Sequence, residues 1–289
     1  MIKKAFLLFG LACILSGGCL FLRKSSLKKD TVSIALKEMT SDEKWFLDFF
    51  FRNHLLRDSG AFVLKGCKPV GLSDFLGPEY YLPTIHWRGY RRSALFKRGY
   101  EIWKKYQHMF PSINYCICYR EDEEDDDQGF YVYLINKKNL LNIVSENIER
   151  FRFNLGTDVT PEILLEKIIN EKKLLTEILH GNAELLGIIL GYGKHNSQLF
   201  YRRETLKKEF IPKKLNLVEE EIAEINKKLQ FHNHQRNHLI FASLPTFVFD
   251  PMHQGTQELN DKYKQQRKEF TNLYKNGDFL ETTLRVLTE

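Results

Sequence analysis

Several catalytic signatures are absent from this sequence of 289 residues. It contains no G-x-S-x-G nucleophile elbow, no H-E-x-x-H zinc motif and no set of protein-kinase motifs. The segment GYGKH at positions 191–195 ends like a phosphate-binding loop, but Ile188 stands where the first glycine of that loop belongs. Asn196 likewise replaces the third glycine of a dinucleotide-binding loop. These absences argue against familiar nucleotide and hydrolase sites, although catalytic residues can also be assembled from separate segments.

Cysteine is too scarce for a disulfide framework. Outside the N-terminal segment the chain has only Cys67, Cys116 and Cys118, an odd number in a large domain. Free, partly buried thiols are therefore expected. Cys116 and Cys118 could bind a soft metal, but no further cysteine or histidine lies near them in the sequence.

Metal-binding patterns are also missing. The histidines of FHNHQRNH, at positions 232, 234 and 238, have no acidic residue among them. The acidic run EDEEDDD at positions 121–127 lacks the glycine and the closing glutamate of an EF-hand loop, so it reads as a solvated loop. We expect no metal and no cofactor.

Only one long apolar run exists, and it lies at the N-terminus. Residues 5–22 carry no charge and are flanked by basic residues on both sides. One interpretation is a lipoprotein signal peptide with Cys19 as the lipid attachment candidate, although Ser16 replaces the aliphatic residue expected there. The other is an uncleaved helix, since 18 helical residues span about 27 Å. Both predict tethering to a membrane through residues 1–30, followed by a linker at 31–39.

The whole chain has a formal net charge of +6 at pH 7, despite the acidic run. The most basic stretch is a predicted helix at about 93–110 with its lead-in, where aromatic residues alternate with Arg88, Arg91, Arg92, Lys97 and Arg98. These five side chains are candidates for an anionic lipid surface. The simpler alternative is an amphipathic helix with solvated charges. Nucleic acid is the least favoured partner because of the membrane segment.

Small residues recur every fourth position in the segment 182–204, at Ala183, Gly187 and Gly191, with His195 on the same line. In a helix this spacing makes one stripe, and glycine there costs about 1 kcal/mol relative to alanine. The stripe predicts a central helix that another backbone or a ligand approaches closely. The candidates for ligand binding or packing are Gly187, Gly191, Gly193, Lys194, His195 and Asn196. The preceding helix, joined by His180-Gly181, is the predicted neighbour.

The fold predicted for residues 40–289 is one α+β domain, with a small, mainly antiparallel sheet packed against a larger helical layer. The clearest strands are 113–120 and 129–136, which the acidic loop joins as a hairpin. A capping-box pattern starts a helix at Thr40, and Thr160-Pro161 starts another. Residues 61–70 read as a short strand and residues 71–90 as a loop, whereas 137–153 and 161–179 each read as one helix.

Three segments together resemble a group of uncharacterised, membrane-tethered proteins of chlamydia-like bacteria. They are GAFVLKGCKPVGL at 60–72, LLGIILGYGKHNSQLFYRRE at 185–204 and SLPTFVFD at 243–250. The resemblance covers most of residues 40–275. It implies a bacterial envelope protein and supplies no catalytic residues.

Together these observations predict a membrane-tethered protein of a bacterial envelope that acts through interaction, with a protein partner or an anionic lipid surface. The alternative is an enzyme that acts on an envelope or lipid substrate with a site near Lys194–Asn196. A pocket beside that segment would favour a binding or catalytic role for it over pure packing.

Overall fold

The computed structural model describes most of the chain after the N-terminal segment. The described residues are 31–64, 66–75, 87–122, 129–210, 216–228, 230–231, 242 and 248–289. Residues 1–30, including Cys19, lie outside them, as do His232, His234 and His238. The predictions made for those positions stay predictions.

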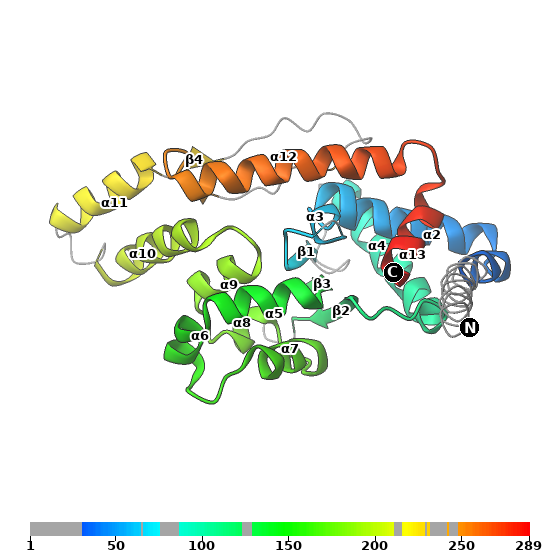
Figure 1. The fold of residues 1–289 in the computed structure, drawn as a ribbon, viewed down its shortest axis with the longest axis horizontal. Helices are drawn as coiled ribbons and strands as arrows, with labels where there is room; N and C mark the ends of the chain where they lie inside the picture. The colour runs from blue at the N-terminus through cyan, green and yellow to red at the C-terminus, as the bar shows by residue number, and fades with distance from the viewer. Residues whose placement is uncertain are drawn as a thin grey trace, which may run out of the picture.

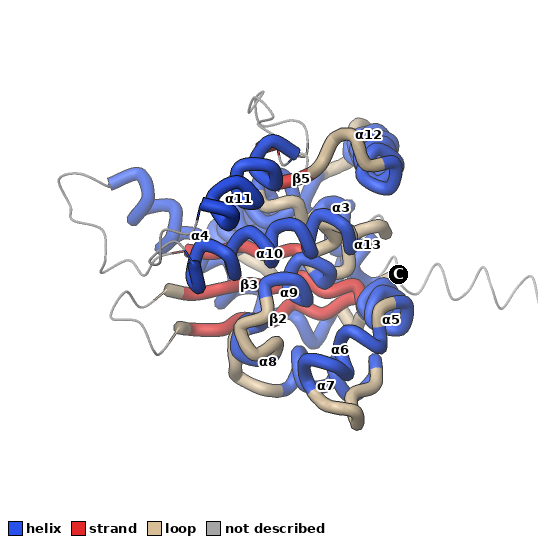
Figure 2. Tube along the Cα trace, turned by 90° about the vertical axis from the view of Figure 1, so that its left-hand side faces the viewer, coloured by secondary structure: helices blue, strands red, loops and turns tan. Residues whose placement is uncertain are grey.

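A three-stranded antiparallel sheet lies at the centre of the fold (Figure 2). Its strands follow the order β1-β3-β2 and are β1 (Val70–Phe75), β2 (Tyr115–Glu121) and β3 (Phe130–Asn136). The predicted hairpin is confirmed, with Cys118 opposite Tyr133 and Cys116 opposite Ile135. Because side chains alternate along a strand, each strand gives one set of side chains to each face of the sheet.

Aromatic rings dominate one face of the sheet, which we call the aromatic face. Helices α2 (Ser41–Arg52), α4 (Trp87–Tyr106) and α13 (Phe279–Thr288) contribute to its core. The Phe96 ring centre lies 4.3 Å from that of Phe75 and 4.7 Å from that of Phe50. The capping box predicted at Thr40 is present, with its hydroxyl accepting from the Glu43 N–H.

Aliphatic side chains dominate the opposite face, which we call the aliphatic face. Its core comes from β-strand residues such as Ile135 and from five short helices. These are α5 (Lys137–Glu146), α6 (Ile148–Leu155), α7 (Pro161–Asn170), α8 (Leu175–Ile178) and α9 (Ala183–Ile189). The α+β class and the small antiparallel sheet are confirmed. Helices cover both faces rather than one, which explains why the β3 sequence FYVYLIN is apolar at nearly every position.

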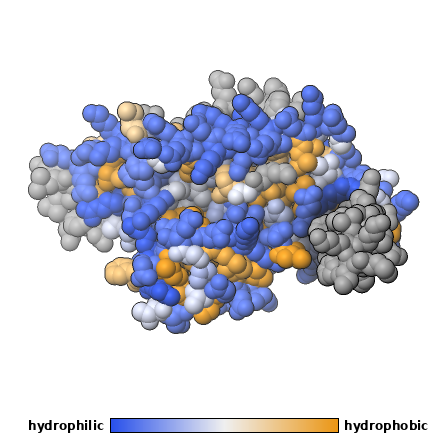
Figure 3. Space-filling view, viewed as in Figure 1, coloured by the Kyte–Doolittle hydropathy of each residue, from blue (hydrophilic) through white to orange (hydrophobic). Residues whose placement is uncertain are grey.

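Three further helices extend from this core (Figure 1). They are α10 (Lys194–Phe210), α11 (Asn216–Lys228) and the long α12 (Gln254–Tyr274), which runs along the upper edge of the view toward α13. A two-residue pairing of β4 (Gln230–Phe231) with β5 (Val248–Phe249) lies near the start of α12. In Figure 3 hydrophilic residues cover the α12 edge, whereas apolar residues show over α5–α7.

Two predictions near the start of the described chain are wrong. The predicted linker at 31–39 is helical over 31–38, and Val32 and Ala35 are fully buried. The predicted strand at 61–70 begins instead with the short helix α3 (Ala61–Leu64). Strand β1 starts only at Val70, the last residue of the predicted strand, and continues through residues 71–75 of the predicted loop. Every residue of α3 is buried, so its apolar run has no periodicity that distinguishes helix from strand.

Two predicted helices are each divided in the structure. The first breaks at Asn147, whose φ of −120° and ψ of 18° are not helical, between α5 and α6. The second breaks after Asn170, and α8 resumes at Leu175. Thr160 caps α7 as predicted, with its hydroxyl accepting from the Ile163 N–H at 3.2 Å.

Candidate functional site

The glycine-rich segment forms two helices rather than one. Helix α9 ends at Ile189, α10 begins at Lys194, and residues 190–193 turn between them. Gly191 and Gly193 have φ angles of +77° and +82°, in the left-handed region that glycine adopts without steric cost. The prediction of one central helix is therefore wrong, because these two glycines end a helix instead of lining it.

Close approach does occur at Gly187, but its partner is not the predicted one. A Cβ atom on Gly187 would lie 2.6 Å from Ser197 Oγ, which belongs to α10. The Ser197 hydroxyl donates to the Gly193 carbonyl at 2.8 Å. Helices α9 and α10 thus pack against each other at this glycine, and the small residue is needed for their contact.

Gly191 joins the turn to two distant segments. Its carbonyl accepts a hydrogen bond of 2.7 Å from the Tyr263 hydroxyl of α12. A Cβ atom here would also meet Lys68 and Pro69, at 3.1 and 3.2 Å. Lys68 is buried, and its Nζ lies 5.6 Å from the centre of the Tyr192 ring. Desolvation lowers the pKa of this lysine to about 8.

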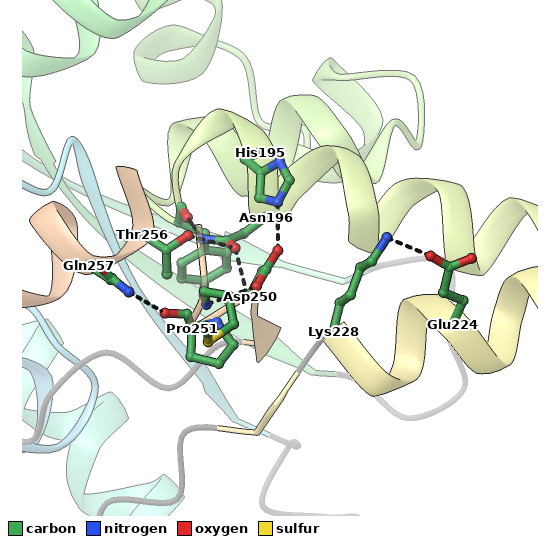
Figure 4. A network of polar contacts seen from close by, with 10 residues as sticks. His195, Asn196, Glu224, Lys228, Asp250, Pro251, Thr256 and Gln257 are labelled. Atoms are coloured by element: carbon green, nitrogen blue, oxygen red, sulfur yellow. Dashed lines mark hydrogen bonds and ion pairs between the residues drawn. The ribbon is translucent and has the colours of Figure 1, made fainter. Parts of the chain in front are cut away.

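The side chain of Asn196 links three separate segments of the chain through hydrogen bonds (Figure 4). Its side-chain oxygen accepts from the Asp250 N–H at 3.0 Å and from the Thr256 hydroxyl at 3.2 Å, while its amide donates to the Tyr192 carbonyl. The residue is buried, so these bonds satisfy polar groups that water does not reach. Asn196 therefore fixes the end of β5 and the start of α12 to the α9–α10 turn.

His195 points toward the same corner (Figure 4). Its Nε2 lies 3.1 Å from Asp250 Oδ2, and its ring stacks on His253 with centres 3.8 Å apart. Burial opposes ionisation of Asp250, but hydrogen bonds from His195 and the Met252 N–H lower its pKa. The His195 side chain is 34% exposed. It makes no hydrogen bond to a serine or cysteine within the described part of the chain, so this pair lacks an activated nucleophile.

Lys194 faces a cavity rather than the corner at which His195 and Asn196 lie. It lines a cavity of about 600 Å³ between α5, α6, α9 and α10, which we call the α6–α10 cavity. Phe153 and Tyr201 also line it, and these two aromatic side chains are 90% and 38% exposed. Arg150 and Glu184 form an ion pair in its wall. The remaining lining residues are Glu146, Asn147, Ile148, Glu149, Asn154 and Asn182. Of the candidates near the turn, only Lys194 reaches this cavity.

The basic helix α4 carries less free charge than its sequence indicates. Lys97 pairs with Glu121 at 3.3 Å, and Arg98 pairs with Glu101 at 2.9 Å. Arg92 contacts Asp58 at 3.4 Å and lies over the Phe75 ring. Arg91 is exposed, and the side chain of Arg88 is outside the described part. Three of the five candidates are thus engaged with acids of the same chain.

A buried polar network on the aromatic face has no counterpart in the sequence predictions. The Ser73 hydroxyl donates to Asp58 Oδ2 at 2.7 Å, and His54 Nδ1 lies 2.5 Å from the same hydroxyl. Burial lowers the pKa of His54 to about 3, and its Nε2 has no partner among the described residues. His54 lies in a π-helical turn, Asn53–Arg57, that continues α2. No local motif reveals such a turn, because it depends on packing.

Comparisons with protein-family models, with curated proteins and with solved structures find no match for this chain. Within the described ranges, no helix has both the length and the apolar character that crossing a membrane requires. Within the same ranges, no group of three or more histidine, cysteine, aspartate or glutamate side chains is placed to hold a metal ion.

Proposed function

We propose that this protein is a membrane-tethered envelope protein that binds a segment of a partner protein in the α6–α10 cavity. The observation that carries the proposal is the pairing of two exposed aromatic side chains, Phe153 and Tyr201, around one cavity of about 600 Å³. That volume suits a side chain or a short peptide segment. Exposed aromatic residues at a concave surface are typical binding anchors.

Charge favours a protein segment over a lipid surface as the occupant. Glu146 and Glu149 on one wall face the same cavity as Lys194 on another, and Arg150 is paired with Glu184. Anionic lipid would require a surplus of free positive charge, which this mixed lining does not offer. A peptide with an apolar side chain and a neighbouring basic group would complement Phe153, Tyr201 and the two glutamates.

Peptide selection tests the binding proposal. A displayed library of random peptides is selected on the folded protein, and binding is measured by fluorescence polarisation. We expect the selected peptides to share an apolar residue, and Phe153→Ser or Tyr201→Ser to weaken them about tenfold or more. Ile113→Ser is the matched control, since Ile113 is 84% exposed and does not line the cavity. Peptides that bind all three variants equally would exclude the cavity as the binding site.

Fractionation tests the membrane proposal separately. The full chain is expected in the membrane fraction, and a chain beginning at Asp30 in the supernatant, because residues 5–22 are the longest uncharged apolar run. The shortened chain must keep residues 31–38, whose helix buries Val32 and Ala35. Palmitate labelling lost on Cys19→Ala would identify a lipoprotein. Recovery of the full chain in the supernatant at low and high salt would overturn the tether.

A second candidate function is an enzyme acting on an envelope or lipid substrate, and the His195–Asp250 pair favours it. A partly exposed imidazole oriented by a carboxylate is suited to general base chemistry. Turnover of a chromogenic ester and a chromogenic phosphate monoester would be compared in the wild type, His195→Ala and His253→Ala. Loss of turnover in a folded His195→Ala chain supports the enzyme. Equal turnover in all three chains excludes His195 as a catalytic residue.

A further inference from the structure

Two cysteine side chains lie together on the aliphatic face of the sheet. Cys116 and Cys118 are two positions apart in β2, and their sulfur atoms are 3.5 Å from each other. Strand β2 is at the edge of the sheet in the order β1-β3-β2. Cys116 is partly exposed, whereas Cys118 is only 5% exposed. Cys116 is therefore the more accessible of the two thiols.

Positive charge surrounds this pair. Arg120 is the next residue on the same face of β2, and its Nη2 donates to the carbonyls of Ile168 and Ile169. Its Nε is buried and has no partner among the described residues. The positive charge of Lys137 also lowers the pKa of Cys116. The other ionisable groups near the thiols are the phenols Tyr100 and Tyr133, and Tyr133 lies opposite Cys118 in the register.

The pKa values of the two thiols are shifted in opposite directions. A hydrogen bond from Cys118 lowers the pKa of Cys116 to about 7, and Lys137 and Arg120 act in the same direction. The same hydrogen bond, together with burial, raises the pKa of Cys118. One sulfur is thus ready to react as a thiolate, and its neighbour retains a proton.

We propose that Cys116 and Cys118 form a peroxide-reactive dithiol, with Cys116 as the attacking thiol and Cys118 as the resolving thiol. In the first step the Cys116 sulfur attacks one oxygen of a hydroperoxide. The S–O bond forms, the O–O bond breaks, and the alcohol or water leaves with one proton. In the second step the Cys118 sulfur attacks the Cys116 sulfenic acid. The S–S bond forms, the S–O bond breaks, and the hydroxyl leaves as water with the Cys118 proton.

The strand geometry makes such a disulfide possible but strained. Cα atoms two positions apart on a strand are about 6.5 Å apart. Disulfides usually join Cα atoms about 4.4 to 6.8 Å apart, so the bond would form near the upper limit of that range. Strained disulfides are the more easily reduced ones. The oxidised pair should therefore be reversed by a mild dithiol.

Peptide mass spectrometry after hydrogen peroxide treatment of the full chain tests the proposal. The tryptic peptide 106–120 contains both cysteines, and we expect it to lose two hydrogen atoms in mass and regain them with dithiothreitol. Cys67 is the internal control. Its thiol donates to Gln266 at 2.7 Å, and burial raises its pKa to about 12. Iodoacetamide near neutral pH should therefore alkylate Cys116 at least about tenfold faster than Cys67.

Two variants separate the roles of the pair. Cys118→Ser keeps a hydrogen-bond donor but no second sulfur, so it should accumulate a Cys116 sulfenic acid that dimedone traps. Cys118→Ala removes the donor as well and should slow alkylation of Cys116 severalfold. An unchanged peptide 106–120 in the wild type under peroxide would overturn the proposal. So would alkylation of Cys67 as fast as Cys116, or the absence of a dimedone adduct in Cys118→Ser.

Discussion

The aromatic and aliphatic faces share the same three strands but are covered by different side chains. On the aromatic face, rings from α2, α4 and the strands surround a buried polar network of His54, Ser73 and Asp58. On the aliphatic face, leucine and isoleucine from five short helices surround a thiol pair at the edge strand. The difference shows that one sheet can hold a fully buried imidazole on one face and a partly exposed thiol on the other.

The physical reason lies in how each face is closed. Helices α2 and α4 are 12 and 20 residues long and cross the aromatic face as continuous covers. The aliphatic face is covered by helices of 4 to 10 residues, whose ends bring loops and carbonyls close to the edge strand. Arg120 reaches two such carbonyls at the end of α7. Strand β2 is at the edge of the sheet, and its residues are partly exposed on both faces except for the buried Cys118.

Truncation of a large core side chain on either face should give the largest loss of stability. Phe96 is fully buried against the rings of Phe50, Phe75 and Phe130, so Phe96→Ala should lower the free energy of unfolding by about 4 kcal/mol. Leu140 is the matched position on the aliphatic face, and Leu140→Ala should cost about 3 kcal/mol. Urea denaturation followed by circular dichroism measures both. A larger loss for Leu140→Ala would show that the aliphatic face is the more tightly packed one.

Lowering the pH should destabilise the protein through His54 on the aromatic face. The folded chain holds His54 neutral with a pKa of about 3, whereas the unfolded chain has the ordinary value of 6.5. The unfolded state therefore binds this proton first, and the stabilisation is present above about pH 6.5 and is lost as the pH falls. The expected loss from this group is about 1.4 kcal/mol for each pH unit.

His54→Asn isolates this effect, because its amide can still donate to Ser73 but does not titrate. Burial raises the pKa of Asp58, which acts in the opposite direction, so the difference between wild type and variant is the relevant quantity. Urea denaturation between about pH 6 and pH 4 should give a flatter stability profile for the variant. Parallel profiles for the two chains would exclude His54 as the acid-sensitive group.

The smallest effect is expected where the α9–α10 turn contacts α12 and Lys68. Gly191→Ala should lower the free energy of unfolding by about 2 kcal/mol, since it combines an unfavourable φ with contacts of 3.0 to 3.2 Å. Gly181→Ala is the matched control, because its φ is also positive but nothing lies within 4 Å of the added carbon. It should cost only about 1 kcal/mol. Equal decreases in Tm for the two variants would show that the neighbours of Gly191 move aside without a loss of stability.

Periodicity and capping patterns in the sequence were sufficient for several elements. The β2–β3 hairpin, the Thr40 capping box and the Thr160 cap all follow from local signals, because each depends on residues close together in the chain. The alternation of side chains along a strand also follows from local geometry, and it places Cys116 and Cys118 on the same face of β2. The site near Lys194 was predicted as a segment, but not how its residues divide between the cavity and the β5–α12 corner.

Local pattern alone therefore determined the α+β class, the hairpin and the special role of the glycines. Tertiary structure decided that Gly191 and Gly193 end a helix, because a helical stripe and a helix-ending turn use the same residue type. It also decided that α3 is a helix, that His54 lies buried in a π-helical turn beside Ser73, and that Phe153 stands exposed at a cavity. Burial, close approach and charge pairing all depend on residues distant in the chain, and no local pattern encodes them.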